Sequence, residues 1–240
     1  MRLIWVMLNV AIWTIILGST GMIVSIFERK GKFMSWVAIT WSKLILWGSG
    51  VDYSSTGLEH LDPTCHYIFA GNHESAFDIP LSFAGLPYQM VAIAKVELRK
   101  IPIFGWAMRA GKHIFVDRRN HEKARTSLRE AKIDLEKNPR SILLFPEGTR
   151  SLDGQIHKFK KGGLLLAIET GIPVVPIAMC GTSEVVTKGS WKINATPIEL
   201  RIGQPIITSN FTMEDRDRFT NQVREAVIAL KETWLEEQTA

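Results

Sequence analysis

Apolar positions along the chain follow two different patterns. Residues 3–47 are almost continuously apolar, whereas the rest of the chain alternates short apolar runs with amphipathic stretches. Short apolar runs between turn residues predict buried strands, and amphipathic stretches predict helices. Their alternation is typical of an α/β domain. The sequence therefore predicts one α/β domain over residues 51–240, with a mixed sheet flanked by helices, preceded by a helical segment over residues 1–50.

Each predicted strand in the second region is a short apolar run. These runs are Tyr67–Ala70, Gln89–Ala94, His113–Val116, Ser141–Phe145, Val174–Met179 and Ile198–Ile202. The predicted helices are Ile79–Ala84, Ile103–Ala110, His121–Lys137, Gly163–Glu169 and Met213–Glu236. We expect Thr212 to cap the last helix, whose apolar face is Phe219, Val223, Val227, Leu230 and Trp234.

The N-terminal region has the length and composition of a membrane anchor. Leu3 to Phe27 is a run of 25 residues without a charge, followed by the basic stretch 28–32. About 20 apolar residues suffice to cross a hydrocarbon core. A second apolar stretch, Phe33 to Trp47, follows, and five of the chain's eight tryptophans lie within the first 47 residues, as in an interfacial belt.

We predict that residues 1–50 form a membrane-anchoring helical pair joined at the basic turn. The pair would dip into one leaflet as a hairpin, or consist of one span and one interfacial helix. The basic turn predicts that the remainder of the chain is on the cytoplasmic face, at the inner or plasma membrane if the source is bacterial. The alternative is a buried helical pair in a soluble protein.

The net charge does not by itself identify a binding partner, and the two cysteines predict no disulfides. A net charge of +5 is compatible with nucleic acid, an anionic membrane surface or acidic small substrates. No aromatic-rich stacking module accompanies the basic residues, so we expect no nucleic-acid partner. Cys65 and Cys180 form no disulfide framework, and we expect both to be small buried residues.

The stretch 72–78 holds a histidine and a carboxylate that could act as a pair. His73 follows a predicted strand, and Pro80 indicates that a helix begins near residues 76–78. On a continuous helix, side chains five positions apart would point about 140° away from each other. With His73 in the loop and Asp78 in the first helical turn, the imidazole and carboxylate can meet, which suits a general base. The alternative is that Asp78 only caps the helix and His73 is an ordinary loop residue.

Cationic and turn residues after other strands suggest an anionic substrate. The strand Ser141–Phe145 stops at the turn 146–151, which displays Glu147, Gly148, Thr149 and Arg150. Such a turn could hydrogen-bond hydroxyl groups through Glu147 and hold a phosphate through Arg150. Lys95 and Arg118 also adjoin predicted strand ends, where ligands bind in open α/β sheets. Further cations precede a predicted helix at Lys158, Lys160 and Lys161.

Together these blocks resemble the glycerolipid acyltransferases, most closely those that act on 1-acylglycerol-3-phosphate. The shared blocks, in the family's order, are Asn-His-Glu-Ser-Ala-Phe-Asp at 72–78, the Lys-x-Glu-Leu…Asp-Arg series from 95 to 118, Phe-Pro-Glu-Gly-Thr-Arg-Ser at 145–151 and Val-Pro-Ile at 175–177. The resemblance covers roughly residues 70–180, and the apolar N-terminal pair looks like the membrane-docking helices of compact members.

The resemblance implies a reaction and a set of partners. His73 would be the general base on the sn-2 hydroxyl of lysophosphatidic acid, with Asp78 fixing its tautomer, and the product would be phosphatidic acid. Glu147, Gly148, Thr149 and Arg150 would hold the glycerol phosphate. Lys95 and Arg118 are further phosphate ligands in this interpretation. The acyl donor would be acyl-CoA or acyl carrier protein, with no cofactor and no metal.

Other functions remain open from the sequence. Glycerol 3-phosphate or another lysophospholipid could be the acceptor. A membrane-bound acyl hydrolase would need Ser75 as its nucleophile, although no Gly-x-Ser-x-Gly elbow is present. A lipid or nucleic-acid binder without enzymatic activity would use the basic surface alone.

Overall fold

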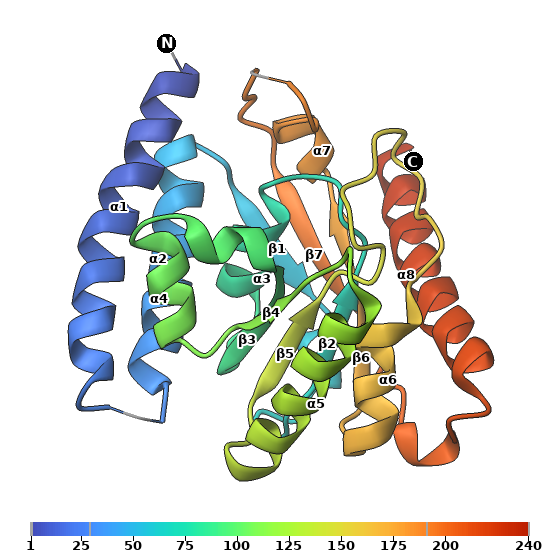
Figure 1. The fold of residues 1–240 in the computed structure, drawn as a ribbon. Coiled ribbons are helices and arrows are strands. Elements are labelled where there is room, and N and C mark those ends of the chain that lie inside the picture. The colour runs from blue at the N-terminus through green and yellow to red at the C-terminus, as the bar shows by residue number, and fades with distance from the viewer. Residues whose placement is uncertain (1, 29, 191, 240) are drawn as a thin grey trace.

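The computed structural model describes residues 2–28, 30–190 and 192–239. Its centre is a seven-stranded sheet in the order β1-β7-β6-β2-β5-β3-β4 (Figure 1). The five strands from β6 to β4 run parallel to one another, whereas β7 pairs with β6 antiparallel and with β1 parallel. The fold is therefore the predicted mixed-sheet α/β domain flanked by helices.

The bounds of the elements agree with most of the predicted ranges. The strands are β1 Tyr53–Thr56, β2 Ile68–Gly71, β3 Met90–Lys95, β4 Ile114–Val116, β5 Ser141–Leu144, β6 Val174–Cys180 and β7 Ile198–Ile202. The helices are α1 Arg2–Ser25, α2 Lys32–Ser49, α3 Asp78–Gly85, α4 Phe104–Ala110, α5 His121–Lys137, α6 Lys161–Thr170, α7 Thr182–Val185 and α8 Arg216–Thr239. Short 3₁₀ turns lie at Leu58–His60, Val96–Lys100 and Thr208–Asn210.

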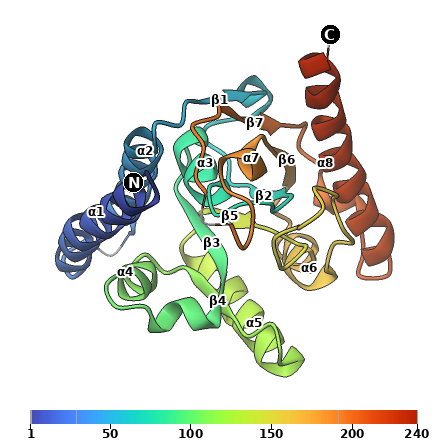
Figure 2. The same cartoon turned by 90° about the horizontal axis from the view of Figure 1, so that it is seen from above.

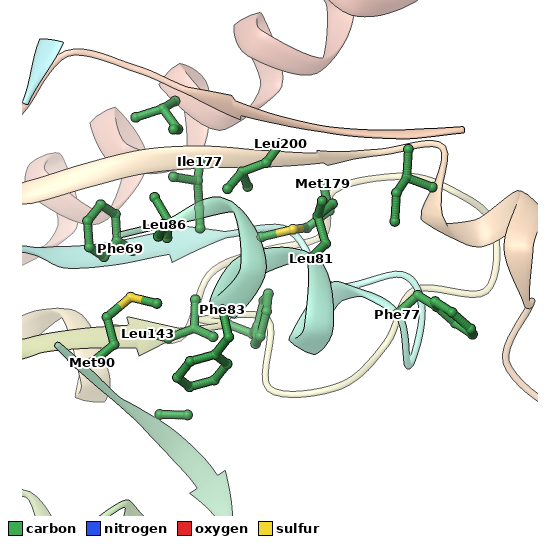
Figure 3. Packing of buried hydrophobic residues seen from close by; sticks show 14 of the residues in the cluster. Phe69, Phe77, Leu81, Phe83, Leu86, Met90, Leu143, Ile177, Met179 and Leu200 are labelled. Carbon is green, nitrogen blue, oxygen red and sulfur yellow. The ribbon is translucent and has the colours of Figure 1, made fainter. Parts of the chain in front are cut away.

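Alternation of side chains along the strands gives the sheet two apolar faces. Ile68 and Ala70 of β2 belong to the core beneath α5, α6 and α8, whereas Phe69 belongs to the opposite core. Figure 3 shows the core that contains Phe69, in which Leu81 of α3 packs against residues of the strands. Seen from above, α3 and the α1–α2 pair lie on one side of the sheet and α6 and α8 on the other (Figure 2). Both faces are thus covered, which explains the continuous apolar runs of the central strands.

Helices α1 and α2 are the predicted pair, and they run in opposite directions at one side of the domain (Figure 1). Small residues allow close packing: a Cβ at Gly48 would clash with the side-chain amide of Asn9, and one at Gly21 would lie 2.7 Å from Met34 Sδ. Arg29 of the basic turn lies outside the described residues. Within the described ranges, α1 is long and apolar enough to cross a membrane.

The outer face of this pair is apolar and uncovered. Its exposed large side chains are Ile4, Trp5, Met7, Leu8, Ile12, Ile15, Ile16, Ile23, Trp36 and Trp47. Soluble monomers seldom expose contiguous apolar patches of this kind without a partner. The alternative of a helical pair fully buried in a soluble core is wrong for this face.

Two local predictions are wrong, and two short elements, β1 and α7, are not among the predicted ranges. Strand β1 was not predicted, because Tyr53–Thr56 lacks a run of apolar residues. Helix α8 begins at Arg216 rather than Met213, because the Thr212 backbone N–H and hydroxyl donate to Asp215 Oδ2 and close a turn before the helix. Cys180 is buried as expected, but Cys65 is exposed.

Candidate active site

His73 and Asp78 are in direct contact at the edge of the sheet where the parallel strands end. His73 lies in the loop between β2 and α3, Asp78 is the first residue of α3, and their Nδ1 and Oδ2 atoms are 2.6 Å apart. A carboxylate partner at Nδ1 makes that nitrogen the proton donor, which leaves Nε2 unprotonated as an acceptor. His73 lines a cavity of about 650 Å³, so a base is available at its wall.

The carboxylate of Asp78 is held by four donors. Its Oδ2 accepts from His73 and from the backbone N–H groups of Glu74 (2.7 Å) and Ser75 (2.9 Å), and its Oδ1 accepts from the hydroxyl of Thr182 (2.5 Å). Asp78 is fully buried, in the first turn of α3. Donors on both oxygens fix the orientation of the carboxylate. The carboxylate held in this way positions the His73 imidazole and would stabilise an imidazolium.

The loop after β5 holds His73 from the other side. The His73 backbone N–H donates to Glu147 Oε1 (2.9 Å), and the Ser151 N–H donates to the His73 carbonyl (2.7 Å). The ring of Phe145 stacks on the imidazole, with centroids 4.3 Å apart. Both motifs predicted from the sequence therefore meet at one histidine.

Glu147 occupies a different place from the one expected. Its second oxygen accepts from the His157 N–H (3.1 Å), and the residue is 5% exposed and absent from the cavity wall. Burial raises the pKa of its carboxyl, and the amide donors of His73 and His157 oppose that rise. The expected contact of Glu147 with substrate hydroxyls finds no support in this geometry, because both oxygens already bind backbone amides.

Of the other cationic and turn residues predicted from the sequence, Lys95, Arg118, Gly148, Thr149, Arg150 and Lys160 line the cavity, whereas Lys158 and Lys161 do not. The end of the cavity near His73 is also lined by Arg119 and Lys188. Arg118 donates to the Gly148 carbonyl, and burial lowers the pKa of its guanidinium. Lys95 pairs with Glu97 at 3.3 Å, which partly neutralises its charge. This end of the cavity could hold a phosphate.

The turn itself needs glycine. Gly148 has a φ of 74°, a left-handed conformation that other residues adopt at a cost. A Cβ at Gly148 would lie 2.9 Å from Lys160 Nζ, so the lysine approaches the turn closely.

The far end of the cavity is apolar and is built mainly from helices. Its wall includes Met34, Val37, Ala38 and Trp41 of α2, Phe83 of α3, and Phe104, Ala107 and Met108 of α4. His113 also lines it; its Nδ1 accepts from the Ala92 N–H (2.9 Å), and burial lowers its pKa to about 4. The imidazole is therefore neutral near pH 7, so no charge interrupts a wall suited to an alkyl chain.

Ser75 is not placed to act as a nucleophile. It is fully buried and absent from the cavity wall, and its hydroxyl donates to the Val186 carbonyl (2.8 Å). The hydrolase alternative loses its proposed nucleophile. In the described part of the chain, no group of three or more His, Cys, Asp or Glu side chains could hold a metal ion.

Sequence reasoning missed Thr182 and Lys188. Thr182 is 104 positions from Asp78, and Lys188 is 38 positions from Arg150. Neither belongs to a recognised block, and both reach the site because β6 ends beside β2. A Gly-Thr pair after a buried strand was the available signal for Thr182, because the glycine permits the turn that aims the hydroxyl back at the sheet edge.

Comparisons with known proteins agree with this geometry. A protein-family model described as Acyltransferase matches residues 53–180. The 1-acyl-sn-glycerol-3-phosphate acyltransferase of Limnanthes douglasii is 33% identical over 186 residues, which are 77% of this chain and 65% of that protein. The Saccharomyces cerevisiae enzyme of the same name is also 33% identical, over 76% of this chain and 61% of its own length. The matches thus span somewhat less than two-thirds of these relatives.

A solved structure matches nearly the whole chain. The crystal structure of the 1-acyl-sn-glycerophosphate acyltransferase of Thermotoga maritima superposes with a TM-score of 0.80 and 28% sequence identity. The match covers 95% of this chain and 94% of that one, so it includes the helical pair as well as the sheet. Taken with the dyad and the cavity, these findings show that the chain belongs to the acyltransferase family.

Proposed function

We propose that this chain transfers an acyl group from a thioester, acyl-CoA or acyl carrier protein, to the sn-2 hydroxyl of 1-acylglycerol-3-phosphate, giving phosphatidic acid. The observation that carries the proposal is the contact of 2.6 Å between His73 Nδ1 and Asp78 Oδ2 at the wall of a cavity that is cationic at one end and apolar at the other. Both named relatives and the Thermotoga protein carry names for this reaction.

His73 acts as the general base. Its Nε2 takes the proton of the acceptor hydroxyl while the hydroxyl oxygen attacks the thioester carbonyl carbon. Asp78 stabilises the imidazolium that forms, because its carboxylate accepts from Nδ1. Collapse of the tetrahedral intermediate breaks the carbon–sulfur bond, and the thiolate takes the proton from Nε2. The base is restored, and no metal or cofactor enters any step.

The two ends of the cavity bind different parts of the substrates. Arg118, Arg150 and Lys95 bind the phosphate of the acceptor, and the turn residues Gly148 and Thr149 approach it closely. The apolar end between α2 and α4 takes an acyl chain. Glu147 positions His73 rather than contacting the glycerol.

The helical pair over residues 1–50 docks the protein on a membrane, with residues 51–240 as the acyltransferase domain on its cytoplasmic face. The exposed apolar face of α1 supports docking, as does Trp106 of α4, which is 54% exposed. Residues Met34 and Trp41 of the same pair line the cavity, so docking brings the cavity to the lipid surface.

The test of the reaction uses the purified full chain in mixed micelles. Formation of phosphatidic acid from acyl-CoA or acyl carrier protein thioesters is measured with lysophosphatidic acid, glycerol 3-phosphate and other lysophospholipids as acceptors. We expect lysophosphatidic acid to give the highest kcat/KM and His73→Ala to lower kcat by at least about 100-fold. His66→Ala, which changes a residue outside the cavity wall, is the matched control. Equally fast thiol release without an acceptor would contradict transfer.

The membrane proposal needs substitutions rather than a truncation. Removing residues 1–47 would also remove cavity wall, because Met34, Val37 and Trp41 line it. Ile12→Ser together with Ile16→Ser changes only exposed positions of α1. We expect weaker binding to phospholipid vesicles and lower activity on vesicle-bound acceptor, with activity on a short-chain soluble acceptor retained. Equal losses on both acceptors would overturn the docking role.

A further inference from the structure

A segment beyond the matched family region contacts the active site. This active-site strap, residues 182–190, follows β6 and comprises α7 and the residues after it. Two hydrogen bonds attach it to the dyad loop: Thr182 Oγ1 donates to Asp78 Oδ1, and Ser75 Oγ donates to the Val186 carbonyl. The family model ends at residue 180, so the strap is outside it.

Lys188 attaches the strap to the turn after β5. Its Nζ donates to the Arg150 carbonyl at 3.0 Å and to Thr149 Oγ1 at 3.2 Å. On the other side of the same turn, Arg118 donates to the Gly148 carbonyl. The turn that displays the expected phosphate ligands is therefore held between two cations, one from the end of β4 and one from the strap.

Lys188 is placed to contact a ligand in the cavity while it also holds the turn after β5. The side chain is half-buried and lines the cavity near His73. An ammonium group has three N–H donors, and the two contacts above leave one available. Thr149 accepts from Lys188, so its own hydroxyl proton is left to donate. Among the described residues, no carboxylate forms an ion pair with Lys188.

We propose that Lys188 binds a phosphate group of a substrate, with Thr149 and Arg150, and so forms a second cationic wall opposite Arg118. The proposal rests on the proposed function, which supplies two sources of phosphate: the acceptor headgroup and the phosphate that joins the pantetheine arm of the donor to the rest of CoA or to the carrier protein. The strap then has two roles, because Thr182 orients the carboxylate of the dyad while Lys188 meets the anion. A purely structural latch would hold the turn without discriminating charged from neutral ligands.

Equilibrium binding distinguishes these roles without depending on turnover. Titration calorimetry on the full chain in detergent compares lysophosphatidic acid with monoacylglycerol, and CoA with pantetheine. For Lys188→Ala we expect binding of one phosphate-bearing ligand to weaken about 10–100-fold, while its phosphate-free counterpart changes less than about twofold. The affected pair identifies the source. Lys188→Arg should retain most of the affinity, and Lys192→Ala, an exposed lysine outside the cavity wall, should change nothing.

Two results would overturn the proposal. Lys188→Ala could leave both phosphate-bearing ligands unaffected, or it could weaken a ligand and its phosphate-free counterpart equally, as expected of a latch. Thermal unfolding of each variant checks that the fold is intact. A wild-type chain that binds these ligands but transfers no acyl group would refute the proposed function and leave the result for Lys188 standing.

Discussion

The two ends of the cavity are built on different physical principles. Near His73 the positions of side chains are set by directional hydrogen bonds, as in the four donors around Asp78 and the two around Glu147. At the apolar end the wall is set by packing, with Met34 and Val37 of α2 buried against α1. Changes at the first end should therefore alter the rate of reaction, and changes at the second should alter which chain fits.

Loss of the Asp78 carboxylate should lower the rate more than any change at the apolar end. In Asp78→Asn the amide cannot accept from all the donors that face the carboxylate, and the Nδ1–H tautomer of His73 loses its support. We expect kcat to fall about 10³–10⁴-fold in the acyl-transfer assay. Asp62→Asn, at an exposed position, is the control. Near-normal activity of Asp78→Asn would remove the dyad from the mechanism.

Glu147→Gln tests whether this residue positions His73 or contacts substrate. Glutamine supplies one acceptor where two backbone N–H groups need one each, so we expect the free energy of unfolding to fall by about 1–3 kcal/mol. The rate constant kcat should fall while KM for the acceptor changes little, because the residue is outside the cavity wall. Steady-state kinetics decide the matter: a raised KM with unchanged kcat would restore the substrate contact.

Ala107→Phe tests whether the apolar end of the cavity selects the length of the acyl chain. Ala107 of α4 lines the apolar end, so the added ring should shorten the space for a chain. We expect the ratio of kcat/KM for long over short acyl chains to fall about tenfold. Ala110→Phe on the same helix, away from the cavity wall, controls for disturbed packing. An unchanged ratio would show that no chain reaches this end.

His113 should make the stability of the fold depend on pH. Its pKa is about 4 in the folded chain, against an ordinary value of 6.5. Between these pH values the unfolded state binds more protons, so stability falls as pH falls from 6.5 towards 4. Thermal unfolding of His113→Gln should show a shallower loss, by up to about 3 kcal/mol over that range. Parallel pH curves would contradict a neutral His113 imidazole in the folded chain.

The features that could be predicted from the sequence are those encoded by neighbouring residues. His73 and Asp78 lie five positions apart, and Pro80 indicates where the helix begins, so local geometry alone made their contact plausible. The buried strands were visible because both faces of the sheet are covered, which makes their residues continuously apolar. Strand β1 lacks that signal, since only alternate side chains are partly buried.

Contacts between distant segments account for most of what the sequence did not reveal. A carboxylate in a turn, such as Glu147, looks the same in sequence whether it faces a cavity or two backbone amides. Thr182 and Lys188 meet the site only after β6 has paired with β2. Their roles depend on strand order, which periodicity does not specify.

The shared wall between the helical pair and the cavity has a consequence for the energy of substrate transfer. Moving an alkyl chain through water would cost about 0.8 kcal/mol for each methylene exposed. Trp41 and Val37 belong to a helix of the pair that we propose to dock on lipid, and both line the cavity. A chain leaving the bilayer along this wall would pass from one apolar environment to another. Along such a path, a longer chain could bind the cavity more tightly. Its exchange with the membrane would still not be slowed by the cost of exposing each additional methylene to water.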